Sequence, residues 1–166
     1  MLKIAVSRCL LGEAVRYDGS AKPCEQLSLL NQIDTEIVAF CPEVSIGMGV
    51  PRLPIQLDLV DGDVLARRKE NVAYDYTKPL SEYAQTFARQ YPDLVAVINK
   101  KSSPSCGYQT TKLYQSGELI HQQASGIFIE KLKQLLPGLY VIDEEMLGNS
   151  RQREEFVTWL KQKSPT

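Results

Sequence analysis

The sequence predicts an α/β fold: a three-layer α/β/α domain, Rossmann-like, with helices on both faces of a mostly parallel central sheet and a short β-hairpin beside it. Strand-length apolar runs alternate with segments of helical periodicity along the chain. Several of these runs are apolar throughout, which is typical of strands buried on both faces. A chain of 166 residues is long enough for one domain with a full core, so residues 1–166 are expected to form a single domain.

The elements follow from the periodicity of the apolar residues. Strands of the central sheet are predicted at residues 2–7, 36–40, 94–99 and 139–142. Apolar side chains recur at intervals of three and four in 80–88 and again in 127–135, which predicts two amphipathic helices. A shorter helix is expected after Pro23, with Cys24 in its first turn, and a last helix is expected to be capped by Ser150.

Turn residues predict the hairpin. Asp61-Gly62 separates an alternating run at 55–59 from a returning run at 64–67, and this dipeptide is a strong hairpin signal. Ser116-Gly117 marks a possible second hairpin. The basic cluster Arg67-Arg68-Lys69 is interpreted as a solvated hairpin end and not as a phosphate site.

Charge and hydropathy restrict the partners. Nineteen basic and 20 acidic residues give a net charge of −1, and nothing resembles the basic surface of a nucleic-acid-binding domain. No apolar stretch approaches the roughly 20 residues that span a bilayer. The apolar run at the N-terminus has the length of a strand and not of a signal peptide. We therefore expect a cytoplasmic protein without a membrane or nucleic-acid partner, and the sequence leaves its oligomeric state open.

Four cysteines are present, and three of them occupy equivalent places. Cys9, Cys41 and Cys106 each follow the end of a predicted strand, whereas Cys24 does not. Because the carboxyl ends of parallel strands meet at one edge of a sheet, where ligands bind in open α/β folds, these three loops are expected to converge. No CxxC pair occurs, so a zinc ribbon or a thioredoxin-type motif is unsupported.

The loop that carries Cys106 combines stiffness with small residues. Pro104 favours an extended Ser103, and Gly107 permits a backbone angle that a residue with a Cβ atom resists. The hydroxyls of Ser102, Ser103 and Ser105 could hydrogen-bond the sulfurs of a cluster. A thiol is thus expected in a rigid turn at the end of a central strand.

Three converging thiols leave three interpretations open. Thiolates select soft metals such as zinc or iron–sulfur clusters, and three protein ligands leave one coordination position open for a substrate. A reactive-thiol enzyme is the second possibility, but it needs a nearby base, and His121, the single histidine, is expected to be an ordinary surface residue. Unconnected cysteines in the core are the third.

Five motifs together resemble one family. It was catalogued as the domain of unknown function 523 and includes the thiouracil desulfidases. The resemblance covers about residues 1–145, and the motifs are Ser7-Arg8-Cys9-Leu10-Leu11-Gly12, Val15-Arg16-Tyr17-Asp18-Gly19, Cys41-Pro42-Glu43-Val44, Gly47-Met48-Gly49-Val50-Pro51-Arg52 and Ser103-Pro104-Ser105-Cys106-Gly107.

The resemblance implies an iron–sulfur enzyme. Family members of known activity hold a [4Fe-4S] cluster on three cysteines and remove sulfur from 2-thiouracil-type bases by a hydrolytic, non-redox route. Carried onto this chain, the cluster ligands would be Cys9, Cys41 and Cys106. Longer relatives with an extra domain act on thiolated tRNA. This chain has no room for that domain, so a thiolated base or nucleoside is the expected substrate.

The resemblance also implies an acidic residue and a serine near the cluster. Glu43 is the candidate acid, expected to deprotonate the attacking water while the substrate sulfur binds the open iron, and Ser103 and Ser105 are the candidate serines. An alternative for Glu43 is an ion pair with Arg16 or Arg52. The competing function is a non-catalytic zinc-binding or redox-sensing domain.

Overall fold

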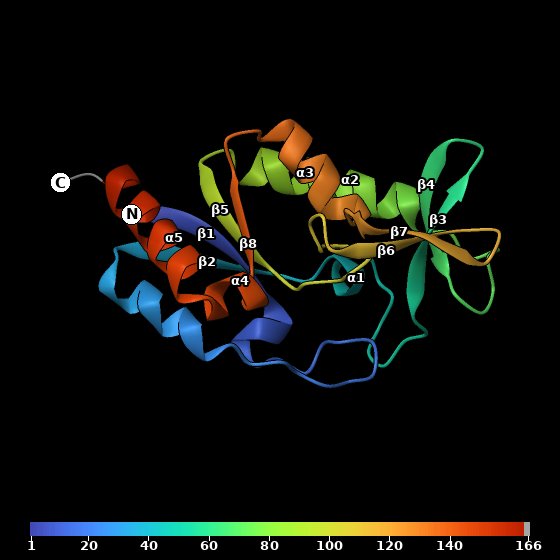
Figure 1. Cartoon of the computed structure of the whole chain (residues 1–166), viewed down its shortest axis with the longest axis horizontal. Coiled ribbons are helices and arrows are strands. Elements are labelled where there is room, and N and C mark those ends of the chain that lie inside the picture. Colours follow the sequence, from blue (N-terminus) through green and yellow to red (C-terminus); the bar gives the residue numbers. More distant parts are fainter. Residues whose placement is uncertain (165–166) are drawn as a thin grey trace.

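The centre of the structure is a parallel four-stranded sheet, here called sheet A. The computed structural model describes residues 1–164. Sheet A has the strand order β2-β1-β5-β8, and every neighbouring pair is parallel (Figure 1). Its strands are β1 (Leu2–Ser7), β2 (Thr35–Phe40), β5 (Leu94–Asn99) and β8 (Tyr140–Asp143). All four strands predicted for the central sheet are therefore confirmed within one or two residues.

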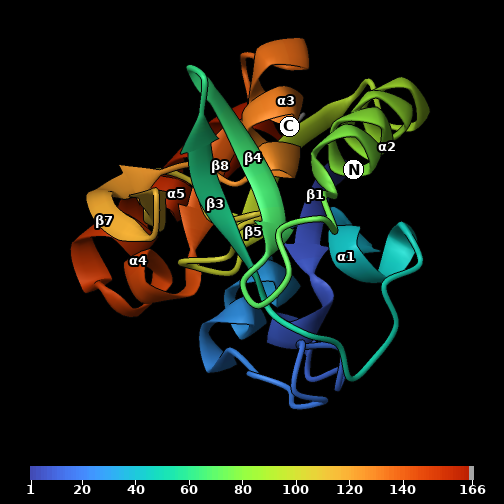
Figure 2. The ribbon, with the colours of Figure 1, turned by 90° about the vertical axis from the view of Figure 1, so that its right-hand side faces the viewer.

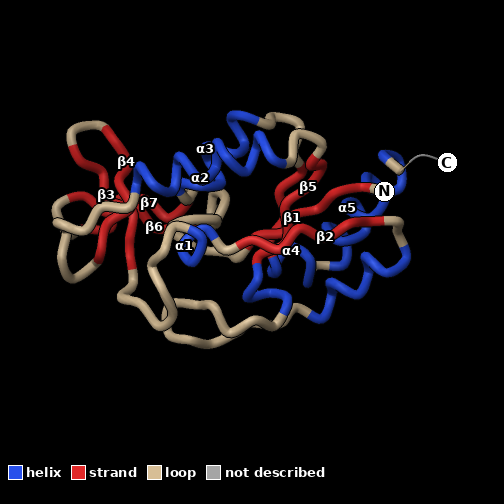
Figure 3. The backbone as a smooth tube through the Cα atoms, turned by 180° about the vertical axis from the view of Figure 1, so that it is seen from behind, coloured by secondary structure: helices blue, strands red, loops and turns tan. Residues whose placement is uncertain are grey.

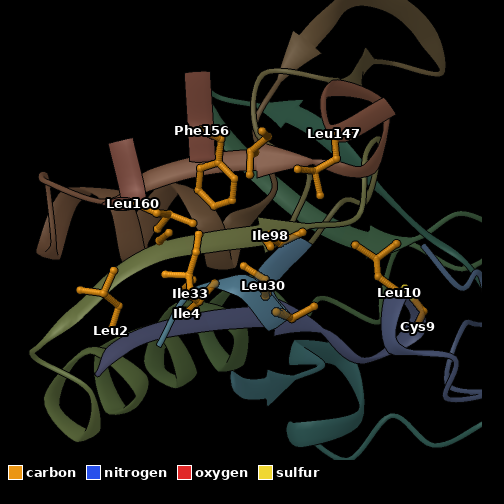
Figure 4. Packing of buried hydrophobic residues seen from close by; sticks show 13 residues of the cluster. Leu2, Ile4, Cys9, Leu10, Leu30, Ile33, Ile98, Leu147, Phe156 and Leu160 are labelled. Atoms are coloured by element: carbon orange, nitrogen blue, oxygen red, sulfur yellow. The ribbon is translucent and has the colours of Figure 1, made fainter. Parts of the chain in front are cut away.

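Side-chain alternation along β1 divides the core into two halves. Leu2, Ile4 and Val6 point to one face, where they pack with Phe156 and Leu160 of α5 (Ser150–Lys163) (Figure 4). The same face is covered by α4 (Glu144–Gly148) and by a 3-10 helix, η2 (Glu25–Gln32). Burial on this scale is the main favourable contribution to folding.

The other face of sheet A packs against two longer helices. These are α2 (Thr77–Gln90) and α3 (Ile127–Leu135), which contact each other. Phe128 lies at the centre of this half of the core, with its ring 5.5 Å from that of Phe40 and 5.6 Å from that of Phe87. Helices thus cover both faces of sheet A, and the predicted three-layer arrangement is confirmed. Within residues 1–164, no helix is both long and apolar enough to cross a membrane.

A second four-stranded sheet, sheet B, replaces the short hairpin of the prediction. Its order is β4-β3-β6-β7, with strands β3 (Ile55–Val60), β4 (Asp63–Arg68), β6 (Thr111–Gln115) and β7 (Glu118–Ala124). Both predicted hairpins form. They join because β3 pairs in parallel with β6, which places Leu57 opposite Leu113. This pairing links segments more than 50 positions apart, so no local sequence pattern predicts it.

Helices α2 and α3 extend over both sheets (Figures 1 and 2). Ala84 and Phe87 of α2 pack on sheet A, whereas Leu80, one turn earlier, packs with Leu57 of sheet B. Ile127, at the start of α3, contacts the same small core under sheet B. The two helices therefore set the position of one sheet relative to the other.

Several local predictions need correction. The segment after Pro23 is not an α-helix but the 3-10 helix η2, and Cys24 precedes it instead of lying in its first turn. The cap of α5 is Asn149, which accepts a hydrogen bond from the amide of Gln152, and not Ser150. Asn149 and Ser150 are adjacent residues that can both cap a helix, so sequence alone cannot distinguish them.

The basic cluster does not lie at the hairpin turn. Arg67 and Arg68 lie at the far end of β4, and the turn is at Asp61-Gly62. Asp58, on the alternating strand β3, is only 4% exposed, and Arg67 binds its carboxylate at 2.9 Å. A buried carboxylate of this kind needs such a partner, so Arg67 has a structural role.

Candidate functional site

The carboxyl edge of sheet A releases the three cysteine-bearing loops toward sheet B. Cys9 lies in the 3-10 helix η1 (Arg8–Leu11) after β1, Cys41 comes directly after β2, and Cys106 follows β5. All three line one cavity of about 860 Å³. Figure 3 shows the long loops beyond η1 and α1 (Pro42–Ser45) running between the two sheets. The structure thus brings together the three loops that the sequence predicted to converge.

Ser7 joins the first and the third of these loops. Its hydroxyl oxygen lies 3.8 Å from the sulfur of Cys9, which donates to it, and 3.9 Å from the sulfur of Cys106. Ser7 is 4% exposed and is the last residue of β1. The Cys9 and Cys106 sulfurs therefore approach the same hydroxyl, although they are 97 positions apart in the chain.

The loop before Cys106 is held by hydrogen bonds to its own backbone. The hydroxyl oxygen of Ser103 accepts from the amides of Ser105 at 3.2 Å and Cys106 at 3.1 Å. The side-chain amide of Asn99, at the end of β5, donates to the carbonyl of Cys106 at 2.7 Å. These contacts orient the Cys106 side chain. In them, the Ser103 hydroxyl oxygen accepts hydrogen bonds from the backbone of its own loop.

Gly107 is required for space and not for its backbone angle. Its φ lies outside the left-handed region, contrary to the prediction. A Cβ atom at Gly107 would lie 2.7 Å from the amide nitrogen of Ser103 and 2.6 Å from the hydroxyl of Thr111. Gly126, which precedes α3, is equally confined, since its Cβ would lie 2.5 Å from the carbonyl oxygen of Ser105. The start of α3 is therefore pressed directly against the Cys106 loop.

Glu43 connects the second loop to the third. Pro42 occupies the first position of α1, where its missing N–H is not needed, and Glu43 follows it on the cavity wall. One carboxylate oxygen accepts from Arg52 at 2.9 Å and the other from the hydroxyl of Ser105 at 2.8 Å. The ion pair with Arg52 that the sequence left open is therefore present, and it lies inside the candidate site.

Comparisons with known proteins agree with this geometry. The sequence profile described as 2-thiouracil desulfurase matches residues 4–145. The chain belongs to the 2-thiouracil desulfurase family. The structure is also similar to that of a protein named [4Fe-4S]-dependent thiouracil desulfidase TudS, with a TM-score of 0.71 and 27% identity over 94% of this chain and 99% of that one. No curated protein sequence matches the chain.

Burial raises the pKa of the three cysteines that line the cavity and so favours their protonated thiol form. It raises the pKa of Cys9 and of Cys41, and it raises the pKa of Cys106 to about 12. The hydrogen bond with Ser7 acts in the opposite direction on the pKa of Cys9. Because only thiolates ligate metals, binding of a metal group here would release protons from these sulfurs.

The donor set suits a group larger than one ion. In residues 1–164, no three His, Cys, Asp or Glu side chains lie close enough together to hold a single metal ion. The three sulfurs instead border a cavity of about 860 Å³. Soft thiolates on separate loops around such a space are of the ligand type that iron–sulfur clusters use, so Cys9, Cys41 and Cys106 are the residues that would hold one.

The remaining residues that the sequence singled out lie outside the cavity or stabilise the loops around it. Cys24, directly before η2, is partly buried against the core and does not line the cavity. Asp18, in the second of the five motifs, accepts hydrogen bonds from the amide and the hydroxyl of Ser20 and so holds its own turn. His121 is exposed on β7, as expected.

Sequence reasoning missed the cationic lining of the cavity. Glu43 is the single acidic side chain among its described lining residues, whereas the basic ones are Arg16, Arg52, Lys69, Lys100, Lys101 and Lys112. Lys100 and Lys101 form ion pairs with Glu144 and Glu145 of α4. These side chains come from separate segments of both sheets and loops. No local signal in the sequence reveals such a grouping, because only the fold brings the segments together.

Replacing Gly126 by alanine should destabilise the protein. The new Cβ would meet backbone atoms of Ser105 that cannot move away without displacing the Cys106 loop, and overpacking of this kind costs about 1–3 kcal/mol. Urea unfolding of the Gly126→Ala variant measures this loss. Gly138→Ala is the matched control, since its Cβ would meet no atom within 4 Å, and it should change the free energy of unfolding by no more than about 0.5 kcal/mol. Equal stabilities of the two variants would contradict the close approach.

Proposed function

We propose that the protein is an iron–sulfur-dependent desulfidase that removes sulfur hydrolytically from a thiolated pyrimidine. The observation that carries the proposal is the convergence of Cys9, Cys41 and Cys106 on one cavity that also contains Glu43. Membership of the 2-thiouracil desulfurase family and the likeness to a [4Fe-4S]-dependent desulfidase support it. The net reaction exchanges a C=S bond for a C=O bond, with water supplying the oxygen and the sulfur leaving as sulfide.

Cys9, Cys41 and Cys106 would hold the [4Fe-4S] cluster. When bound, a cluster with three protein ligands supplies an iron with an open coordination position, a Lewis acid that can polarise a thiocarbonyl. The protein contributes the buried setting. Cys9 is 6% and Cys106 4% exposed, so water has little access to these two sulfurs.

Glu43 would accept the proton of the attacking water. Each of its oxygens already accepts one hydrogen bond, from Arg52 and from Ser105. A carboxylate offers about four acceptor positions, so a water can still bind it. Arg52 and Ser105 fix the orientation of the carboxylate, and Ser103 holds the loop that carries Ser105 and Cys106. Among the two candidate serines, Ser105 therefore acts on Glu43 directly, whereas Ser103 holds the backbone of the Cys106 loop and, by a side-chain hydrogen bond, lowers the pKa of the Cys106 thiol.

The charge of the cavity favours an anionic substrate. Among the lining cations, Arg16, Lys69 and Lys112 have no carboxylate of residues 1–164 within salt-bridge distance. A volume of about 860 Å³ is at the upper end of small-molecule sites, which run from about 300 to 1,000 Å³. Both features suit a thiolated nucleotide, with its phosphate in the cationic part, better than a free base.

Anaerobic reconstitution with iron and sulfide tests the function. The protein should acquire a brown chromophore with about four irons per chain and release sulfide from 2-thiouracil. Cys9→Ser, Cys41→Ser and Cys106→Ser should each lose both, because a missing ligand frees one corner of the cluster. Cys24→Ser is the matched control and should retain both. One zinc per chain, with no sulfide release, would instead favour the binding or sensing domain.

The Glu43→Gln variant should bind the cluster and lose turnover. Glutamine preserves the shape of the side chain but cannot accept a proton, and general bases contribute typically 10²–10⁴-fold to a rate. Iron content and kcat are measured on the same preparation. Ser105→Ala should lower kcat less, since it removes one contact of the carboxylate and not the carboxylate. A Glu43→Gln enzyme with wild-type kcat would remove Glu43 from this role.

Substrates of different charge test the cationic lining. The ratio kcat/KM should rise from 2-thiouracil to 2-thiouridine 5′-monophosphate. In the double variant Lys69→Gln/Lys112→Gln it should fall about tenfold for the nucleotide, which corresponds to about 1.4 kcal/mol of lost phosphate contact, and clearly less for the base. Equal losses for both substrates would show that the lysines do not bind a phosphate.

A further inference from the structure

We propose that Ser7 is a positioning residue whose hydroxyl hydrogen-bonds the cluster-ligating sulfurs of Cys9 and Cys106. The proposal rests on the function given above, and it assigns a role to a residue outside the cysteine, glutamate and serine candidates. The decisive observation is that one buried hydroxyl lies between two sulfurs, at 3.8 and 3.9 Å.

The backbone of Ser7 is held firmly. Ser7 pairs with Phe40 of β2, and the preceding Val6 pairs with Ile98 of β5, so β1 is hydrogen-bonded on both sides up to its end. The side chain is 4% exposed and lines the cavity. The position of the hydroxyl is therefore set by the strand and not by either of the two cysteine loops.

The chemistry of the sulfurs determines the direction of the hydrogen bond. With both thiols protonated, Cys9 donates to Ser7. A ligating thiolate has no proton to donate, so the same contact persists only if the Ser7 hydroxyl becomes the donor. The hydroxyl has one proton and two sulfur neighbours, and it therefore serves Cys9, Cys106 or both in a shared bond.

The other buried serine in the cavity is engaged elsewhere. Ser105, which is 1% exposed, donates its hydroxyl proton to Glu43 at 2.8 Å. Within the described chain, Ser7 provides the hydroxyl that reaches the sulfur of Cys9. Ser105 consequently offers a matched control: it is a buried serine on the same cavity, but its proton is committed to a carboxylate.

Loss of the Ser7 hydroxyl should alter the cluster and not only the turnover. Hydrogen bonds to cluster sulfurs stabilise the more electron-rich reduced state, so Ser7→Ala should shift the reduction potential to a more negative value. Partners of metal ligands also support affinity, typically by 10–100-fold, so iron loss to a chelator should accelerate about tenfold. Potentiometric titration followed by electron paramagnetic resonance, and the rate of chromophore loss, measure the two effects.

Two further variants make the experiment decisive. Ser7→Thr restores a hydroxyl and should return the potential and the rate of iron loss toward the wild-type values. Ser105→Ala should leave both at the wild-type values, because its hydroxyl does not reach a sulfur in the structure. If Ser7→Ala fails to load iron while its apo form unfolds at the wild-type temperature and Ser7→Thr loads, the proposal is also supported.

Two outcomes would overturn the proposal, and they differ in what else they affect. A Ser7→Ala protein with the wild-type potential and the wild-type rate of iron loss would refute the role of Ser7 and leave the desulfidase function intact. A wild-type protein that assembles no cluster under anaerobic conditions would refute both.

Discussion

The parallel pairing of β1 with both β2 and β5 is the constraint on which the site depends. Ser7 lies beside Phe40 and Val6 beside Ile98, so three strands end at nearly the same level of the sheet. Each strand is followed within seven residues by a cysteine of the cavity. In a parallel sheet all carboxyl ends face the same way, so the chain brings the thiols together without any direct attraction between them.

Polar contacts between the three loops fix the positions of their side chains relative to one another. Ser7 bridges the first and third loops, and Glu43 with Ser105 bridges the second and third. These groups are largely buried, and a buried polar group is stabilising only when its hydrogen bonds are satisfied. The same contacts therefore hold the loops together and orient the groups that we propose act on a substrate. Arg52 extends the network to Tyr17, which also lines the cavity: the backbone amide of Arg52 donates to the carbonyl of Tyr17 at 2.7 Å.

Sheet B makes the site a cleft and not an open sheet edge. Helices α2 and α3 pack on both sheets, so sheet B is held opposite the cysteine loops by the same apolar side chains that stabilise the core. Lys112 of β6 and Lys69, next to β4, then face the cavity together with Arg16. The groups that we propose act in catalysis come from the loops after the strands of sheet A, whereas Lys69 and Lys112 reach the same cavity from sheet B.

Local patterns in the sequence determined the strands of sheet A, both hairpin turns, helices α2 and α3, and the three loops that carry Cys9, Cys41 and Cys106. These features depend on the periodicity of apolar residues and on turn residues, which neighbouring positions encode. The tertiary structure alone decided the pairing of β3 with β6, the confinement of Gly107 and Gly126, the position of Ser7 between two sulfurs and the cationic wall. Each of these depends on which distant segments come within a few ångströms of one another. The spacing of residues along the chain does not determine those distances.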